Sequence, residues 1–194
     1  MSNADFDPDG LARTIKQNRG PAPVHLWNPP FCGDIDMRIA SDGSWHYQNS
    51  PITRPAMVKL FSSILRLDED GHYYLVTPVE KVRIQVDDCP FVAQLLEVEG
   101  EGTDQQLWFI TNTEERILAD EDHRIEVSID PATDAPHPRI LCRSNLYALI
   151  ARNVFYQLAE LVEPQNGQSG LGVQPGVQPG VWSAGRFFAL GSRI

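Results

Sequence analysis

The sequence predicts an α+β protein of two lobes made from a duplicated αβ unit, with mainly antiparallel sheets each packed by one helix. Both halves of the 194-residue chain show alternating strand patterns, then a helical pattern, then a last strand, although no residue-level repeat joins them. With 42% hydrophobic and 22% charged residues, the composition is globular. We therefore predict an arm at residues 1–22, an αβ domain at 23–86 and a β-rich domain at 87–194.

The first element is a predicted hairpin in "GDIDMRIASDGSWHYQ", residues 33–48. Asp42 and Gly43 mark its turn. A two-residue loop would place two aromatic residues on the charged face, whereas a three-residue loop with a left-handed Gly43 sets Ile39 opposite Trp45 and gathers five apolar residues on one face. Burying them is worth several kcal/mol at ~25 cal/mol per Å², which favours the three-residue loop. The polar face then carries Asp34, Asp36, Arg38, His46 and Gln48.

A helix and two strands complete the predicted first domain. Thr53 is a suitable N-cap, and apolar residues from Met57 onward recur at helical spacing, so a helix is expected at residues 54–66. Strands are expected at 72–77 and 81–87, where apolar and polar residues alternate.

The second half repeats this pattern at greater length. Gly-rich and Pro-rich breaks separate strands predicted at 91–98, 105–111, 124–130 and 139–142. A long helix is predicted at 144–162, with Ser144 as its cap and a buried stripe beginning at Leu146. The repeat in "GQSGLGVQPGVQPG" predicts a mobile loop at 164–180, and "VWSAGRFFAL" predicts a final strand that packs its aromatic residues inward.

Charge and cysteine usage exclude several classes of function. The net charge is −10, and residues 87–134 alone hold fourteen acidic and two basic residues, so nucleic-acid binding is not expected. Neither a signal peptide nor an apolar span is recognisable, so no membrane contact is expected. Cys32, Cys89 and Cys142 lack metal-ligand spacing and are interpreted as reduced thiols of a cytoplasmic protein without metal or cofactor.

Asp34 and Asp36 are the first candidates for chemistry. On a strand they point the same way with Cα atoms roughly 6.6 Å apart, a spacing that suits a hard cation or a glycosidase pair. Arg38 follows on the same face and would keep both ionised, which is wrong for a general acid. We therefore predict no catalytic residue, and expect these carboxylates at most to line a ligand site. A hydrolase or thiol enzyme using Cys32 with His46, or the Asp34 and Asp36 pair, is the alternative.

Three stretches resemble the bacterial family known as domain of unknown function 1285. They are "WNPPFCGDIDMRIASDGSWHYQNSPITRPAMVKLFSSILR", "GHYYLVTPVEKVRIQVDDCPF" and "VWSAGRFFALG". The resemblance implies a duplicated αβ core whose C-terminal lobe is pleckstrin-homology-like. It also implies a nucleotide-like ligand between the two domains and a role in signalling under oxidative stress, with no catalytic residue carried over.

A physical version of that ligand site follows from two predicted helix starts beside Arg54 and Arg143. A helix N-terminus offers backbone N–H groups and the positive end of its dipole to a phosphate. With Asp34 and Asp36 lining the site, the other predicted ligand-binding residues are Arg54, Lys59 and Arg143 for charge and Trp45, Tyr147 and Trp182 for stacking on a base. The favoured function is thus a non-catalytic ligand-sensing or signalling module. A protein-interaction scaffold that forms a homodimer through an exposed sheet edge is a third possibility.

Overall fold

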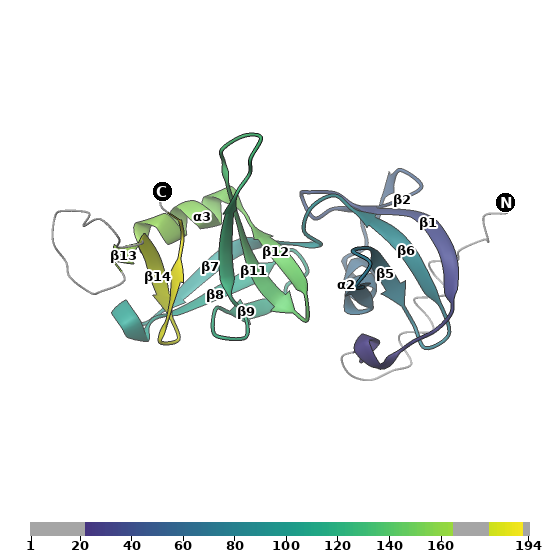
Figure 1. The fold of residues 1–194 in the computed structure, drawn as a ribbon, viewed down its shortest axis with the longest axis horizontal. Helices are drawn as coiled ribbons and strands as arrows, with labels where there is room; N and C mark the ends of the chain where they lie inside the picture. Colours follow the sequence, from purple (N-terminus) through teal and green to yellow (C-terminus); the bar gives the residue numbers. More distant parts are fainter. Residues whose placement is uncertain (1–21, 165–178, 192–194) are drawn as a thin grey trace. The chain divides into compact units, whose positions relative to one another are not determined.

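The computed structural model describes residues 22–164 and 179–191 of the chain (Figure 1). The chain divides into two compact units, the first ending at Pro90 and the second beginning at Phe91. The predicted arm at 1–22 and the predicted loop at 164–180 fall almost entirely outside the described residues. Within the described ranges, no helix combines the length and apolar character needed to cross a membrane.

The first unit is a six-stranded sheet with one α-helix. Its strand order is β3-β2-β1-β6-β5-β4, and every neighbouring pair is antiparallel except the central β1 and β6. The elements are η1 Val24–Leu26, β1 Phe31–Ile39, β2 Trp45–Tyr47, β3 Ser50–Pro51, α2 Pro55–Ser63, β4 Leu65–Leu67, β5 Tyr73–Val76 and β6 Lys81–Val86.

The β1–β2 hairpin confirms the predicted register. Ile39 pairs with Trp45, and Gly43 adopts the left-handed φ of 80° that the three-residue loop requires. Asp42 fixes this loop by accepting hydrogen bonds from the backbone N and the Oγ of Ser44. The apolar face is buried, as at Met37, and the Trp45 ring on it packs against the ring of Phe61 from α2.

The second unit contains a second six-stranded sheet and a smaller three-stranded one. The larger sheet has the order β10-β11-β12-β7-β8-β9, and its one parallel pair is again the central one, β12 with β7. The elements are β7 Phe91–Glu99, η2 Gly102–Asp104, β8 Gln106–Thr111, β9 Arg116–Leu118, β10 Ile125–Ile129, β11 Pro136–Arg143, β12 Leu146–Ile150, α3 Arg152–Glu160, β13 Glu163–Pro164, β14 Pro179–Ser183 and β15 Arg186–Ala189.

The two large sheets have the same topology, which supports the predicted duplication. In each, two three-stranded meanders lie side by side, and the first strand of the unit pairs in parallel with the last strand of the sheet. The helix position differs: α2 lies between the two meanders in sequence, whereas α3 follows the second. The repeat is thus one of strand order, without a repeat of residues.

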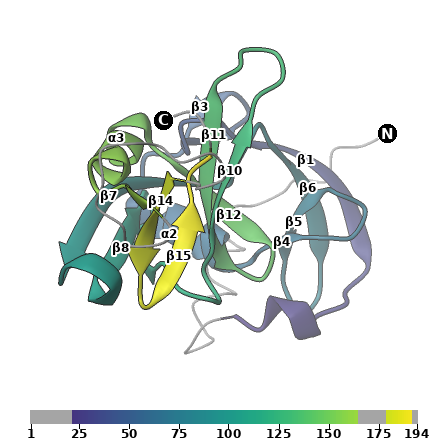
Figure 2. The same cartoon turned by 60° about the vertical axis from the view of Figure 1, so that its left-hand side comes forward.

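One face of the second unit's large sheet is covered by α3 and the β14–β15 hairpin (Figure 2). Val154 and Leu158 of α3 are fully buried, as is Val181 of β14. Ser183 joins the hairpin to the sheet, because its Oγ accepts a hydrogen bond from Leu107 N (2.9 Å) and donates one to Ala119 O (2.7 Å). The opposite face of the large sheet is therefore its outward face.

The predicted helix at 144–162 is wrong over its first half. Leu146–Ile150 is strand β12, and only Arg152–Glu160 is helical. Ser144 has a left-handed φ of 50° and lies in the β11–β12 turn, so it cannot cap a helix there. The stripe that begins at Leu146 satisfies the strand period as well, because every second side chain from Leu146 to Ile150 is buried.

Two further expectations need correction. The expected last strand is a hairpin, β14–β15, which turns at Ala184 and Gly185, both with positive φ. The predicted helix at 54–66 is shorter, because residues 65–67 form β4, and Arg54 rather than Thr53 occupies the N-cap position.

Candidate functional site

The predicted carboxylate pair lies on β1 of the first unit, and Asp34 is neutralised there by an arginine. Arg83 of β6 donates to both carboxylate oxygens of Asp34, at 2.5 and 2.8 Å. These hydrogen bonds hold the pKa of Asp34 below its ordinary value. Arg38, the cation expected beside the pair, bonds instead to Asp87. The ionised Asp34 is therefore unsuited to general-acid chemistry, for the predicted reason but with a different arginine.

Four other predicted residues belong to the first unit. Trp45 is only 2% exposed and packs its ring 6.1 Å from that of Phe61, so it belongs to the core and offers no open face to a base. Arg54 and Lys59 lie at the start and in the middle of α2, where both are exposed. Asp36 is an exposed residue of β1.

Cys32 and His46 are not arranged as a catalytic pair. His46 pairs in register with Arg38, six residues along β1 from Cys32, which is roughly 20 Å of strand at ~3.3 Å per residue. The Cys32 thiol is directed to Pro30 O at 3.4 Å, and the ring of His46 contacts Ser44 Oγ at 3.0 Å. This geometry offers no base to the thiol.

The remaining predicted residues belong to the second unit. Arg143 ends β11, bonds to Glu115 at 2.7 Å and lies 4.9 Å from the centre of the Phe91 ring. It does not start a helix, contrary to expectation. Trp182 is a half-buried residue of β14 whose ring meets Phe187 edge-on at 5.3 Å.

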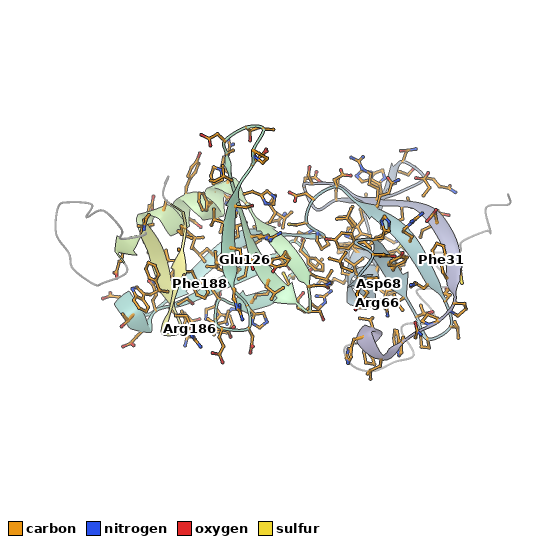
Figure 3. All side chains as sticks on the ribbon, in the orientation of Figure 1. Phe31, Arg66, Asp68, Glu126, Arg186 and Phe188 are labelled. Atoms are coloured by element: carbon orange, nitrogen blue, oxygen red, sulfur yellow. The ribbon has the colours of Figure 1, made fainter. Side chains whose placement is uncertain are left out.

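Tyr147 lies in a hydrogen-bonded polar arrangement on the outward face, which we call the Arg139 cluster: Glu126, Arg139 and Tyr147. Register places Glu126 of β10, labelled in Figure 3, opposite Arg139 of β11, and Tyr147 lies on the adjacent β12. The Arg139 guanidinium lies 4.3 Å from the centre of the Tyr147 ring and donates to Glu126 at 2.9 and 3.2 Å. The Tyr147 hydroxyl donates to the other oxygen of Glu126 at 3.1 Å.

The Arg139 cluster is held in place and still accessible. Burial, helped by the hydrogen bond to Glu126, raises the pKa of Tyr147, so its hydroxyl stays protonated at neutral pH. The Arg139 and Glu126 side chains are 39% and 42% exposed. A guanidinium held over an aromatic ring can stack on a planar group and donate hydrogen bonds to an anion.

The two halves of this sheet differ in formal charge. Strands β10, β11 and β12 contain two arginines, Arg139 and Arg143, and one acidic residue, Glu126. Strands β7, β8 and β9 contain one arginine, Arg116, and two acidic residues, Glu97 and Glu99. The formal charge is therefore +1 on one meander and −1 on the other. Within an acidic domain, the β10–β12 half is the one that suits an anion.

Sequence reasoning missed Arg83, Glu126 and Arg139. All three act through cross-strand neighbours between 13 and 49 residues away, so only the strand register reveals their partners. The alternation around Arg139 in "HPRILCR" gave a signal for its outward face, but none for Glu126 or Tyr147 as neighbours.

A second charged cluster, in the first unit, has a structural role. Asp68 accepts hydrogen bonds from Arg66 (2.5 and 3.1 Å) and Lys81 (3.0 Å), and Figure 3 shows Arg66 and Asp68 side by side. Arg66 also donates to the carbonyl oxygens of Val24 and Trp27. The cluster thus fastens η1 to the sheet, and its donors are already used within the unit.

These features define a two-unit α+β protein with a duplicated sheet topology. Two family models match it: "Domain of unknown function (DUF1285), N-terminal domain" over residues 22–89 and "Protein of unknown function (DUF1285), C-terminal domain" over 90–190. The chain belongs to the DUF1285 family, which confirms the resemblance.

Two solved structures resemble the chain. A DUF1285 family protein from Silicibacter pomeroyi DSS-3 is 51% identical, with a TM-score of 0.84 over 96% of each chain. A DUF1285 family protein from Shewanella baltica OS155 is 24% identical, with a TM-score of 0.50 over 65% of this chain and 91% of that one, and shows similarity of fold alone. No curated protein matches the chain.

Proposed function

We propose that this protein is a non-catalytic sensing module that binds an anionic, nucleotide-like small molecule at the Arg139 cluster of its second unit. The observation that carries the proposal is the fixed guanidinium of Arg139 over Tyr147, on the meander with an excess of positive charge. A base or another planar group can stack on the guanidinium plane, and a phosphate can accept hydrogen bonds from the guanidinium N–H groups that do not bond to Glu126. A pleckstrin-homology-like second unit and a cytoplasmic, signalling role belong to the same proposal.

The absence of turnover is proposed from the candidate catalytic groups themselves. Asp34 is tied to Arg83 with a lowered pKa, so it is not available as a proton donor near neutral pH. The separation of Cys32 from His46 along β1 disfavours a thiol enzyme. Binding without chemistry is the function that these arrangements support best.

The test is a thermal-shift screen of the full chain against mono-, di- and cyclic nucleotides. A ligand at 100 times its Kd adds about 2.7 kcal/mol of stability, which raises the melting temperature by several degrees. We expect such a shift in the wild type and its loss in Arg139→Ala.

Arg116→Ala is the matched control, because Arg116 also lies over an aromatic ring and bonds to glutamates in the same sheet. The control should keep the shift. Flat curves for the wild type across the panel would contradict a nucleotide-like ligand, and an equal loss in both variants would show that the Arg139 cluster is not the site.

A further inference from the structure

We propose that the outward face of β7, β8 and β9 docks a basic, partly apolar segment of a partner protein. We call this surface the Trp108 face, made of Leu95, Glu97, Glu99, Trp108, Arg116 and Leu118. It lies on the other meander from the Arg139 cluster and shares no residue with it. The proposal therefore stands independently of the proposed function.

Strand register places these side chains on one face. Glu97 pairs with Trp108, and Trp108 pairs with Leu118 across the next strand. Residues directly opposite in antiparallel strands point to the same side of a sheet. The neighbouring Leu107 and Phe109 point to the other side and are fully buried under the cover of α3 and the β14–β15 hairpin.

The Trp108 face combines an exposed apolar side chain with a tryptophan ring over which an arginine is held in place. Leu95 is 61% exposed, which leaves a large aliphatic side chain in water. The Arg116 guanidinium lies 3.9 Å from the centre of the Trp108 ring, and hydrogen bonds to Glu97 (3.0 Å) and Glu99 (2.6 Å) fix it there. Tryptophan and arginine in rigid, partly desolvated positions dominate the binding energy of many protein interfaces.

The negative charge of the Trp108 face indicates which kind of partner it binds. Glu97 and Glu99 outnumber Arg116, and the exposed Glu101 and Asp104 follow directly after β7. From Phe91 onward the sequence holds fourteen acidic residues and seven arginines, with no lysine. A nucleic acid, an anionic membrane or a second copy of this acidic face would be repelled. A segment with lysine or arginine would pair with the carboxylates and cover the apolar residues with its side-chain stems.

The experiment uses the full chain and a fluorescein-labelled peptide of alternating Lys and Leu residues, with an alternating Glu and Leu peptide as its counterpart. Fluorescence anisotropy should show binding of the Lys peptide only, and binding should weaken as salt is raised. Glu97→Gln with Glu99→Gln should weaken binding by about tenfold, because the charges that attract the peptide are removed.

Glu126→Gln is the matched control, since Glu126 also holds an arginine over an aromatic ring but on the other meander. It should bind like the wild type. Leu95→Lys alters only an exposed side chain, so the variant should fold normally. It should still bind the Lys peptide more weakly, because it replaces an apolar contact with a positive charge. Equal binding of both peptides, or unchanged binding in the Glu97/Glu99 variant and in Leu95→Lys, would overturn the proposal. Nucleotide binding through Arg139 should remain measurable in the Glu97/Glu99 variant and in Leu95→Lys, because neither changes a residue of the Arg139 cluster.

Discussion

Asp68 shows how one carboxylate can help to hold a short helical turn against a sheet. Its side chain is only 18% exposed, yet it takes hydrogen bonds from Arg66 and Lys81, and Arg66 in turn reaches two carbonyl oxygens around η1. Burial by itself would raise the pKa of Asp68, but hydrogen bonds from Arg66 and Lys81 outweigh burial and hold it below the ordinary value. The folded structure therefore stabilises the ionised form of Asp68.

Asp68→Asn should lower the free energy of unfolding at pH 7 by about 2 to 3 kcal/mol, because the interactions with Arg66 and Lys81 lose the negative charge and one of the two acceptor oxygens becomes an NH2 donor. A carboxylate with a lowered pKa stabilises the fold above its unfolded pKa of about 3.9 and stops doing so as the pH falls through the folded value. Urea unfolding should thus show a wild-type advantage that narrows below about pH 4. The exposed neighbour provides the control: Glu69→Gln should stay within about 0.5 kcal/mol of the wild type. A constant difference at all pH values would contradict this role of the charge.

In the β14–β15 hairpin, Gly180 has no space for a side chain. A Cβ atom on Gly180 would lie 2.5 Å from Phe187 Cζ and still closer to the carbonyl oxygen of Phe188. The backbone oxygen cannot move without breaking the pairing of Gly180 with Ala189, so glycine is required there for close approach of the two strands.

Gly180→Ala should destabilise the second unit by about 1 to 3 kcal/mol, the usual cost of forcing extra volume into a packed site. Hydrogen exchange should accelerate first in the hairpin and at Leu107, whose N–H is held by Ser183 Oγ. The β1–β6 sheet, in the other unit, is the internal reference and should keep its protection. Normal exchange at Leu107 in this variant would mean that the hairpin tolerates the extra methyl group.

Elements whose contacts are local could be predicted, and those that depend on remote partners could not. The register at Ile39 and Trp45 followed from a short loop and the burial of one face. β12 was misread because a strand running almost directly into a helix keeps a continuous apolar stripe, and length could not separate them. Of the three residues of the Arg139 cluster, only Tyr147 was predicted, because Glu126 and Arg139 are brought to it by sheet pairing.

The whole chain repeats one sheet topology, and each unit has its own core. Phe61 and Trp45 are buried in the first unit, and Phe91 and Phe109 in the second, each at 2% exposure or less. In each large sheet, the central parallel pair joins the first strand to the last, so all the strands of a sheet come from one unit. Cooperative unfolding is therefore expected unit by unit.

Phe61→Ala should lower the stability of the first unit by about 3 to 5 kcal/mol, since it removes a fully buried ring and leaves a cavity. Native-state hydrogen exchange should show faster opening of β1, β5 and β6, with β7, β8 and β12 unchanged. Phe109→Ala provides the mirror-image control, because it removes an equally buried ring from the second unit. If either variant lowered the hydrogen-exchange protection of both units, the chain would unfold as one cooperative body despite its two cores. The duplicated sheet topology would then not correspond to separate units of unfolding.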